Sequence, residues 1–81
     1  MSITRLAPFP PIEATVGDTV RWTNNHGGNV HEIAGVANAF RSSGVLRFGE
    51  SYSITLSTVG EITYFDTFHP SIMVGTCNKD E

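Results

Sequence analysis

The sequence predicts an all-β sandwich or barrel of about seven strands, and three observations support this fold class. Apolar runs recur at a spacing of roughly 8 to 12 residues, which is typical of such folds. Within the runs, apolar and polar residues alternate with the period of two that a half-buried strand shows. No window of about 11 to 18 residues has the 3.6-residue period of a helix.

The expected strands are the segments in which this alternation is bounded by Gly, Asn or Ser clusters. They are residues 12–16, 19–23, 30–34, 51–56, 61–66 and 73–78, and residues 1–6 are expected to supply one short edge strand. We expect one β-hairpin around the Gly17-Asp18 turn and a second around Val59-Gly60, within two packed sheets of antiparallel strands. Residues 35–48 have the weakest pattern and are expected to form an irregular crossover with a helical turn, and residues 79–81 a solvated tail.

The composition indicates a single soluble globular domain that spans residues 1–81. Hydrophobic residues make up 40% of the chain, charged residues 16%, and the net charge is −3. The five Lys and Arg residues are scattered, so no nucleic-acid surface is predicted. No apolar run is long enough to span a membrane, and residues 1–11 lack the apolar core of a signal peptide. We therefore expect either a cytosolic protein or one whose leader was removed before residue 1.

Two polar residues fall on faces that should be buried. Asp66 shares the parity of Ile62 and Tyr64, and His31 is in phase with Ile33. A carboxylate that points into a core needs a partner, because an unpaired buried charge is costly.

The loop after Asp66 adds two further potential ligands, His69 and Met73. We predict a metal site formed by His31, Asp66, His69 and Met73. The alternative is a closed hydrogen-bond network without metal, in which Asp66 or Glu32 accepts from an imidazole N–H. Met73 suits either a ligand role or a core position.

The remaining reactive side chains have simpler explanations. His26 lies in a Gly/Asn loop and is expected to be a solvent-exposed turn residue, with a ligand role as the less favoured alternative. Cys77 excludes an intramolecular disulfide and is expected in the core of the last strand, with a thiolate ligand or an intermolecular bridge as the alternatives. No nucleophile elbow or phosphate-binding glycine loop is present, so we do not expect an enzyme.

Two segments resemble the plastocyanin and amicyanin branch of the cupredoxins. They are VGDTVRWTNNHGGNVHEI and FGESYSITLSTVGEITYFDTFHPSIMVG. The resemblance implies a Greek-key β-sandwich that binds one copper ion, with His31 as the early imidazole ligand, His69 as the late one and Met73 as the axial thioether. It also implies electron transfer or copper handling with a redox or copper-donor/acceptor protein, in an extracytoplasmic compartment.

Asp66 occupies the position of the family's cysteine ligand. Without a thiolate, the donor set becomes two imidazoles and a carboxylate, with a thioether beside them, which suits a type 2 Cu(II) or a Zn(II) site better than a blue one. We therefore expect a copper-binding protein with an altered, non-thiolate site. A zinc-binding variant and a metal-free binding or structural module remain the alternatives.

Overall fold

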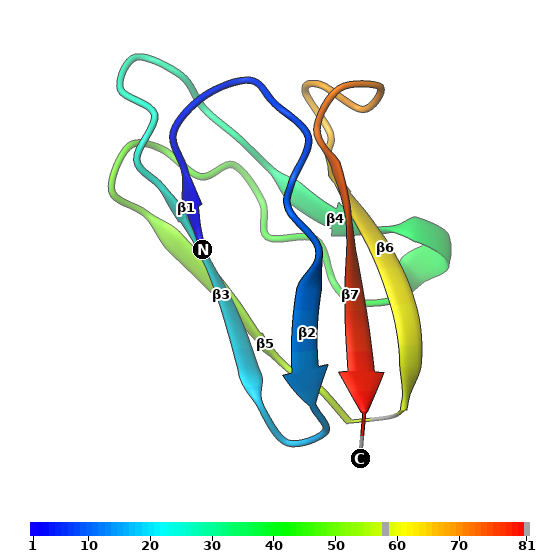
Figure 1. Cartoon of the computed structure of the whole chain (residues 1–81). Coiled ribbons are helices and arrows are strands. Elements are labelled where there is room, and N and C mark those ends of the chain that lie inside the picture. The colour runs from blue at the N-terminus through cyan, green and yellow to red at the C-terminus, as the bar shows by residue number, and fades with distance from the viewer. Residues whose placement is uncertain (58, 81) are drawn as a thin grey trace.

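Two β-sheets face each other in the computed structural model, which describes residues 1–57 and 59–80 (Figure 1). One sheet has the strand order β1-β3-β5 and the other the order β2-β7-β6-β4. The strands are β1 (Ser2–Ile3), β2 (Ile12–Thr15), β3 (Thr19–Asn24), β4 (Ile33–Gly35), β5 (Ser51–Thr55), β6 (Gly60–Asp66) and β7 (Val74–Asp80). The predicted β-sandwich is confirmed.

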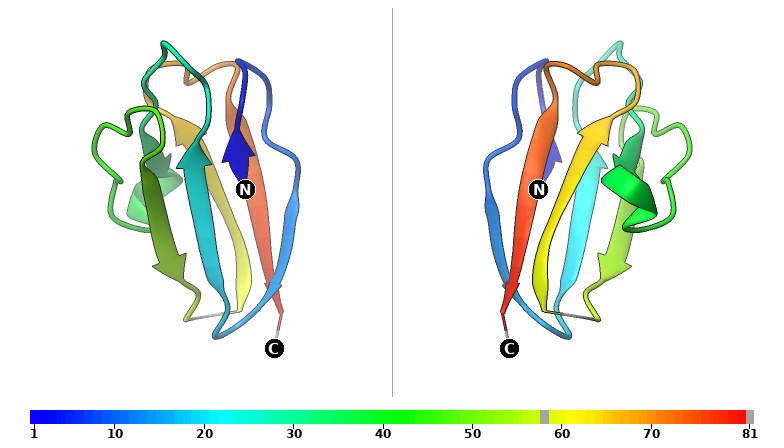
Figure 2. Two further views of the ribbon diagram at one scale, coloured as in Figure 1. Left: turned by 90° about the vertical axis from the view of Figure 1, so that its left-hand side faces the viewer. Right: turned by 90° about the vertical axis from the view of Figure 1, so that its right-hand side faces the viewer.

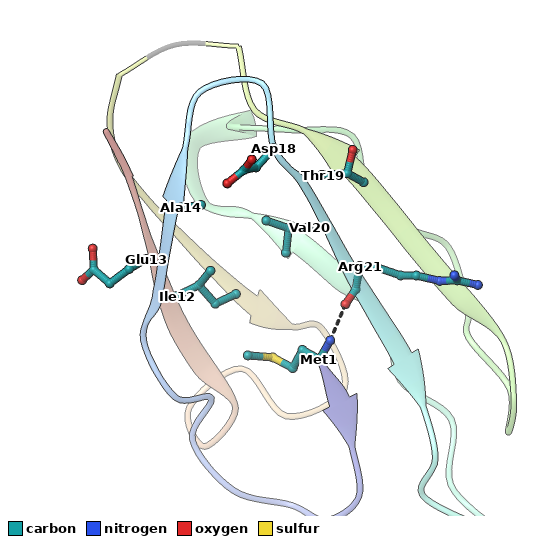
Figure 3. A pocket seen from close by; sticks show the side chains of 8 residues that line it. All are labelled: Met1, Ile12, Glu13, Ala14, Asp18, Thr19, Val20 and Arg21. Carbon is teal, nitrogen blue, oxygen red and sulfur yellow. Dashed lines mark hydrogen bonds between the residues drawn. The ribbon is translucent and has the colours of Figure 1, made fainter. Parts of the chain in front are cut away.

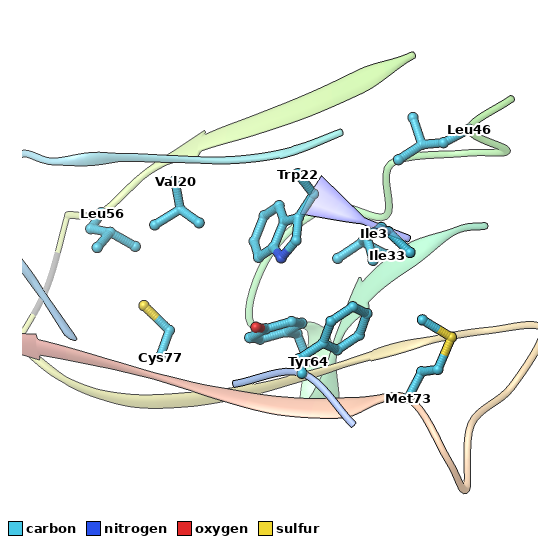
Figure 4. Packing of buried hydrophobic residues seen from close by; sticks show 10 residues of the cluster. Ile3, Val20, Trp22, Ile33, Leu46, Leu56, Tyr64, Met73 and Cys77 are labelled. Carbon is cyan, nitrogen blue, oxygen red and sulfur yellow. The ribbon is translucent and has the colours of Figure 1, made fainter. Parts of the chain in front are cut away.

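Strand alternation builds the core between the sheets. In β3, Val20, Trp22 and Asn24 are buried while the residues between them are more exposed. Trp22 meets Tyr64 of β6 edge to face, with ring centroids 5.1 Å apart. Such an aromatic pair contributes about 0.5–1.5 kcal/mol beyond its buried area. Figure 4 shows this pair in the middle of the core, where it connects the two sheets.

Both expected hairpins are wrong. β2 pairs with β7 and β3 pairs with β5, so the chain changes sheets at the Gly17-Asp18 turn. The backbone N–H of Val16 donates to the carbonyl of Asp80, and that of Gly17 donates to the carbonyl of Leu56. Neither N–H therefore bonds across the turn to the other strand of the expected hairpin. β5 and β6 likewise lie in different sheets. Alternation determines which face of a strand is buried, but it does not determine the strand's neighbour.

The strand directions and the C-terminal end also differ from expectation. The sheets are mixed, because β1 runs parallel to β3 and β2 runs parallel to β7. Lys79 and Asp80 belong to β7; the predicted solvated tail is wrong for Lys79, which is only 9% exposed, whereas Asp80 is exposed as expected. Glu81 lies outside the described residues. The helical turn expected within residues 35–48 is confirmed as the 3₁₀ helix η1 (Val36–Asn38).

Four connections gather at one end of the sandwich. They are the segments at residues 4–11, 25–32, 44–50 and 67–73, which lie at the top of Figure 1 and in both views of Figure 2. β6 ends at the same place, so this end collects His31 and the loop that follows Asp66. Among the described residues, no helix is long and apolar enough to cross a membrane.

Candidate functional site

His31 is held by its own backbone at the loop end of the sandwich. Its N–H donates to the carbonyl of Leu46 at 3.0 Å, and the N–H of Leu46 donates back in an isolated antiparallel bridge. The buried Asn24 side chain supports this bridge, because its Nδ2 donates to the carbonyls of Leu46 and Asn29 at 2.8 and 2.9 Å. The His31 side chain is fully buried, as its parity predicted.

Asp66 lies opposite Ile33 in the pairing of β4 and β6, and it is also fully buried. Its Oδ2 contacts Nδ1 of His31. Its Oδ1 accepts from the backbone N–H of Phe68 at 2.8 Å and, at 3.5 Å, from that of Glu32. The inward carboxylate therefore has the partner that its burial demands. Glu32 does not bond an imidazole, because its carboxylate accepts from the Thr67 hydroxyl.

The loop between β6 and β7 is closed by its own backbone. His69 N–H donates to the carbonyl of Asp66 at 3.1 Å, Met73 N–H donates to the carbonyl of His69 at 2.9 Å, and Asp66 N–H donates to the carbonyl of Met73 at 2.9 Å. These bonds bring the half-buried His69 ring to 6.1 Å from the His31 ring, centroid to centroid, with the planes tilted by 55°.

That separation is compatible with one metal ion between the two rings. Metal–nitrogen bonds are about 2.0–2.1 Å long, so two imidazoles on one ion have centroids at most about 6.4 Å apart. Among residues 1–57 and 59–80, however, no three His, Cys, Asp or Glu side chains form a ready-made metal cluster. His31 Nδ1 is hydrogen-bonded to Asp66 and would have to lose its proton before it could bind an ion.

The sulfur atoms of Cys77 and Met73 lie at opposite ends of the core (Figure 4). Cys77 is 1% exposed beside Val20 and Leu56, and burial raises the pKa of its thiol. Its predicted core position is confirmed. Met73 is at the end that carries His31, and its side chain borders a cavity of about 180 Å³ lined by the N-terminal segment.

His26 is the residue that sequence reasoning missed. Its expected place as a solvent-exposed turn residue is wrong, because the side chain is half-buried and its Nδ1 lies 3.1 Å from Nε2 of His31. The turn at residues 26–29 brings it there: Asn29 N–H donates to the carbonyl of His26, and Gly28 has φ +81°, which suits the third position of a type II turn. The sequence signal was the pair of glycines between two histidines.

The residues fit a metal ion of intermediate hardness and do not fit a thiolate site. Two imidazoles and one carboxylate are suitable donors for Cu(II) or Zn(II). Neither imidazole nor the Asp66 carboxylate supplies a thiolate, and Cys77 lies too deep at the other end of the core to do so.

A larger cavity, of about 340 Å³, lies away from this site (Figure 3). It opens between β2 and β3, where the two sheets separate, and Figure 3 shows the Met1 amine donating to the carbonyl of Arg21 beside it. Glu13 and Asp18 supply its acidic side chains, and no histidine or cysteine lines it. This cavity therefore lacks the borderline donors of the histidine end.

The structure is similar to those of several copper proteins. A reduced Cu(I) form at pH 4 of an amicyanin mutant superposes with a TM-score of 0.86, at 26% identity, over 98% of this chain and 78% of that one. The reduced state of another amicyanin mutant gives 0.85 at 27% identity with the same coverage. A novel purple cupredoxin from Nitrosopumilus maritimus gives 0.78 at 28% identity over 86% of this chain and 77% of that chain.

No protein-family model and no curated protein sequence matches the chain. The two mixed sheets and the structural similarity nevertheless define the class: the chain has the cupredoxin fold. Within that class it is similar to amicyanin over nearly its whole length.

Proposed function

We propose that this protein binds one copper ion at the loop end of the sandwich. His31 and His69 are its imidazole ligands, Asp66 takes the place of the thiolate, and Met73 borders the site. The observation that carries this proposal is the buried contact between Asp66 and His31, at the end of a cupredoxin fold where the loop also delivers a second imidazole.

The protein's own residues prepare this site. The bridge with Leu46 fixes the backbone of His31, and the Phe68 N–H holds Asp66 Oδ1, so Oδ2 remains directed at His31 Nδ1. The half-buried His69 can form and break a ligand bond with less rearrangement than a core residue. Copper, when bound, would supply one-electron exchange, or serve as cargo, for a redox or copper-accepting protein partner.

A metal-free binding module is the second candidate. The observation that favours it is that Asp66 and His31 satisfy each other in the core without an ion. A buried pair of this kind can persist as a structural element, because removing one partner leaves the other uncompensated. Zinc is the third possibility, since the same donors bind it.

Metal analysis of protein purified without added metal, followed by calorimetric titration with Cu(II) and Zn(II), tests the proposal. We expect one copper ion per chain. His69→Ala should weaken binding by at least about 100-fold, because removing even a residue that only supports a ligand costs 10–100-fold. Glu61→Gln, at the exposed opposite end of β6, is the matched control and should bind like the wild type. Equal affinity of His69→Ala and the wild type would refute the ligand assignment.

A further inference from the structure

His26 has no role in the copper site proposed above, yet its ring is tied to a ligand of that site. The two rings lie edge to edge, with centroids 5.3 Å apart and planes 20° from parallel, and Nδ1 of His26 lies 3.1 Å from His31 Nε2. On its other side, Nε2 lies 3.1 Å from Nδ2 of Asn29. Four side chains therefore form one hydrogen-bonded chain, from the exposed Asn29 through both imidazoles to the buried Asp66.

The groups at the two ends of this hydrogen-bonded chain determine which atom donates and which accepts in each of its hydrogen bonds. At the inner end, Asp66 Oδ1 accepts from the backbone N–H of Phe68 and Oδ2 contacts His31 Nδ1; a carboxylate is acceptor-only, so Oδ2 accepts as well. At the outer end, Nδ2 of Asn29 also lies 3.4 Å from the carbonyl of Gly27, which requires a donor. The Asn29 amide nitrogen therefore faces the ring of His26.

A neutral imidazole has one donor and one acceptor, so the ends fix both rings. Asn29 donates to His26 Nε2, His26 Nδ1–H donates to His31 Nε2, and His31 Nδ1–H donates to Asp66 Oδ2. The opposite direction would set two N–H groups against each other at Asn29 and leave Asp66 Oδ2 without a donor. Both histidines therefore carry their proton on Nδ1.

We propose that His26 is a positioning residue for His31 that works in both directions. In the metal-free protein it donates to His31 Nε2. When His31 Nδ1 holds a metal ion, Nε2 must carry the proton, and His26 Nδ1 becomes its acceptor. The acceptor role in the metal-bound protein rests on the proposed function, whereas the donor role in the metal-free protein does not.

This reversal of the hydrogen-bond direction leaves the number of protons on the two imidazoles unchanged. The His31 Nδ1 proton leaves to solvent, the His26 Nδ1 proton passes to His31 Nε2, and His26 takes one proton from solvent on Nε2. The Asn29 amide turns so that its oxygen accepts from that new N–H; it gives up its 3.4 Å contact with the carbonyl of Gly27, which is exposed and can accept from water instead. The half-buried position of His26 gives it the solvent access that the exchange needs.

Nitrogen NMR of protein labelled with ¹⁵N-histidine tests the direction without metal. In long-range ¹H–¹⁵N spectra at about pH 8, where an ordinary histidine is neutral, we expect His26 and His31 each to show a pyrrole-type Nδ1 and a pyridine-type Nε2. A proton on Nε2 of His26, or on both nitrogens of either ring, would overturn the assignment.

Zn(II), which is diamagnetic, tests the reversal in the same spectra. On loading, His31 Nδ1 should shift as a metal-bound nitrogen, and His26 should change from the Nδ1–H to the Nε2–H pattern without binding metal itself. Loading that leaves His26 unchanged refutes the reversal. If neither Zn(II) nor Cu(II) binds, the proposed function fails, and the metal-free spectra alone decide the direction of the chain.

Two variants separate the hydrogen bond from the packing of the ring. His26→Phe keeps an aromatic ring beside His31 but has no donor or acceptor, whereas His26→Asn keeps an amide that can donate or accept near the place of Nδ1. We expect His26→Phe to bind Cu(II) about 10-fold more weakly, the lower end of the range for residues that support a ligand, and His26→Asn to recover most of that loss. Equal affinities in the two variants contradict the proposal, and if His26→Phe does not fold, the wild-type spectra before and after Zn(II) decide.

Discussion

Replacing Asp66 with cysteine should convert the site to a coloured copper centre at a measurable cost in stability. The substitution removes the carboxylate that accepts from His31 Nδ1 and from the backbone N–H of Phe68. A hydrogen bond to a charged group contributes about 1.5–3 kcal/mol, so we expect the metal-free variant to lose about 2–3 kcal/mol. For a domain of this size, that loss lowers the unfolding temperature by about 10–20 °C.

Copper should more than reverse this loss. At a free concentration about 1,000 times the dissociation constant, a ligand adds about 4 kcal/mol to the free energy of unfolding. The thiolate introduced at position 66 would complete a His₂Cys set with Met73 beside it, so an intense visible absorption should appear after one equivalent of Cu(II). The wild type should remain nearly colourless, even though it contains Cys77.

The assay combines visible spectra with thermal unfolding followed by circular dichroism, before and after Cu(II). Asp66→Ser is the matched control, because it removes the same carboxylate and supplies no sulfur. A folded Asp66→Cys variant that binds no copper, or binds it without colour, would refute the convergence of His31, His69 and position 66 on one ion.

Three further predictions concern the core. Burial raises the pKa of Tyr64 to about 12, whereas an unfolded tyrosine ionises at about 10. The free energy of unfolding should therefore fall as the pH rises from about 10 towards 12. In urea titrations, the Tyr64→Phe variant should not show the decrease that Tyr64 causes. The Cys77 thiol, buried and with a raised pKa, should react with a thiol reagent only in denaturant, and rapid labelling of the native protein would contradict its core position. In Gly75→Ala, the new Cβ would lie 2.6 Å from Tyr64 Cζ and 2.7 Å from Phe9 Cβ, which should cost about 1–3 kcal/mol; an unchanged urea midpoint would show that the ring can move aside.

Sequence periodicity predicted the parts of this molecule that depend on one strand at a time. The inward positions of His31 and Asp66 followed from parity, because a residue two places from a core residue shares its face. The pairing of β2 with β7 did not follow, since it depends on which sheet the chain enters after Gly17. His26 was missed for a related reason: parity has no meaning in a loop, and a turn around Gly28 carries this ring to its partner.

The place of β7 in its sheet has a consequence for how the chain folds. β7 follows the other three strands of its sheet in the sequence, yet it lies between β2 and β6 and pairs with both. Until β7 is in place, β2 has no neighbour in its sheet. The four-stranded sheet can therefore be completed only after β7 itself has been synthesised. Because β2 and β7 come from opposite ends of the chain, their pairing also carries the large loop-closure entropy that makes such topologies slow to fold.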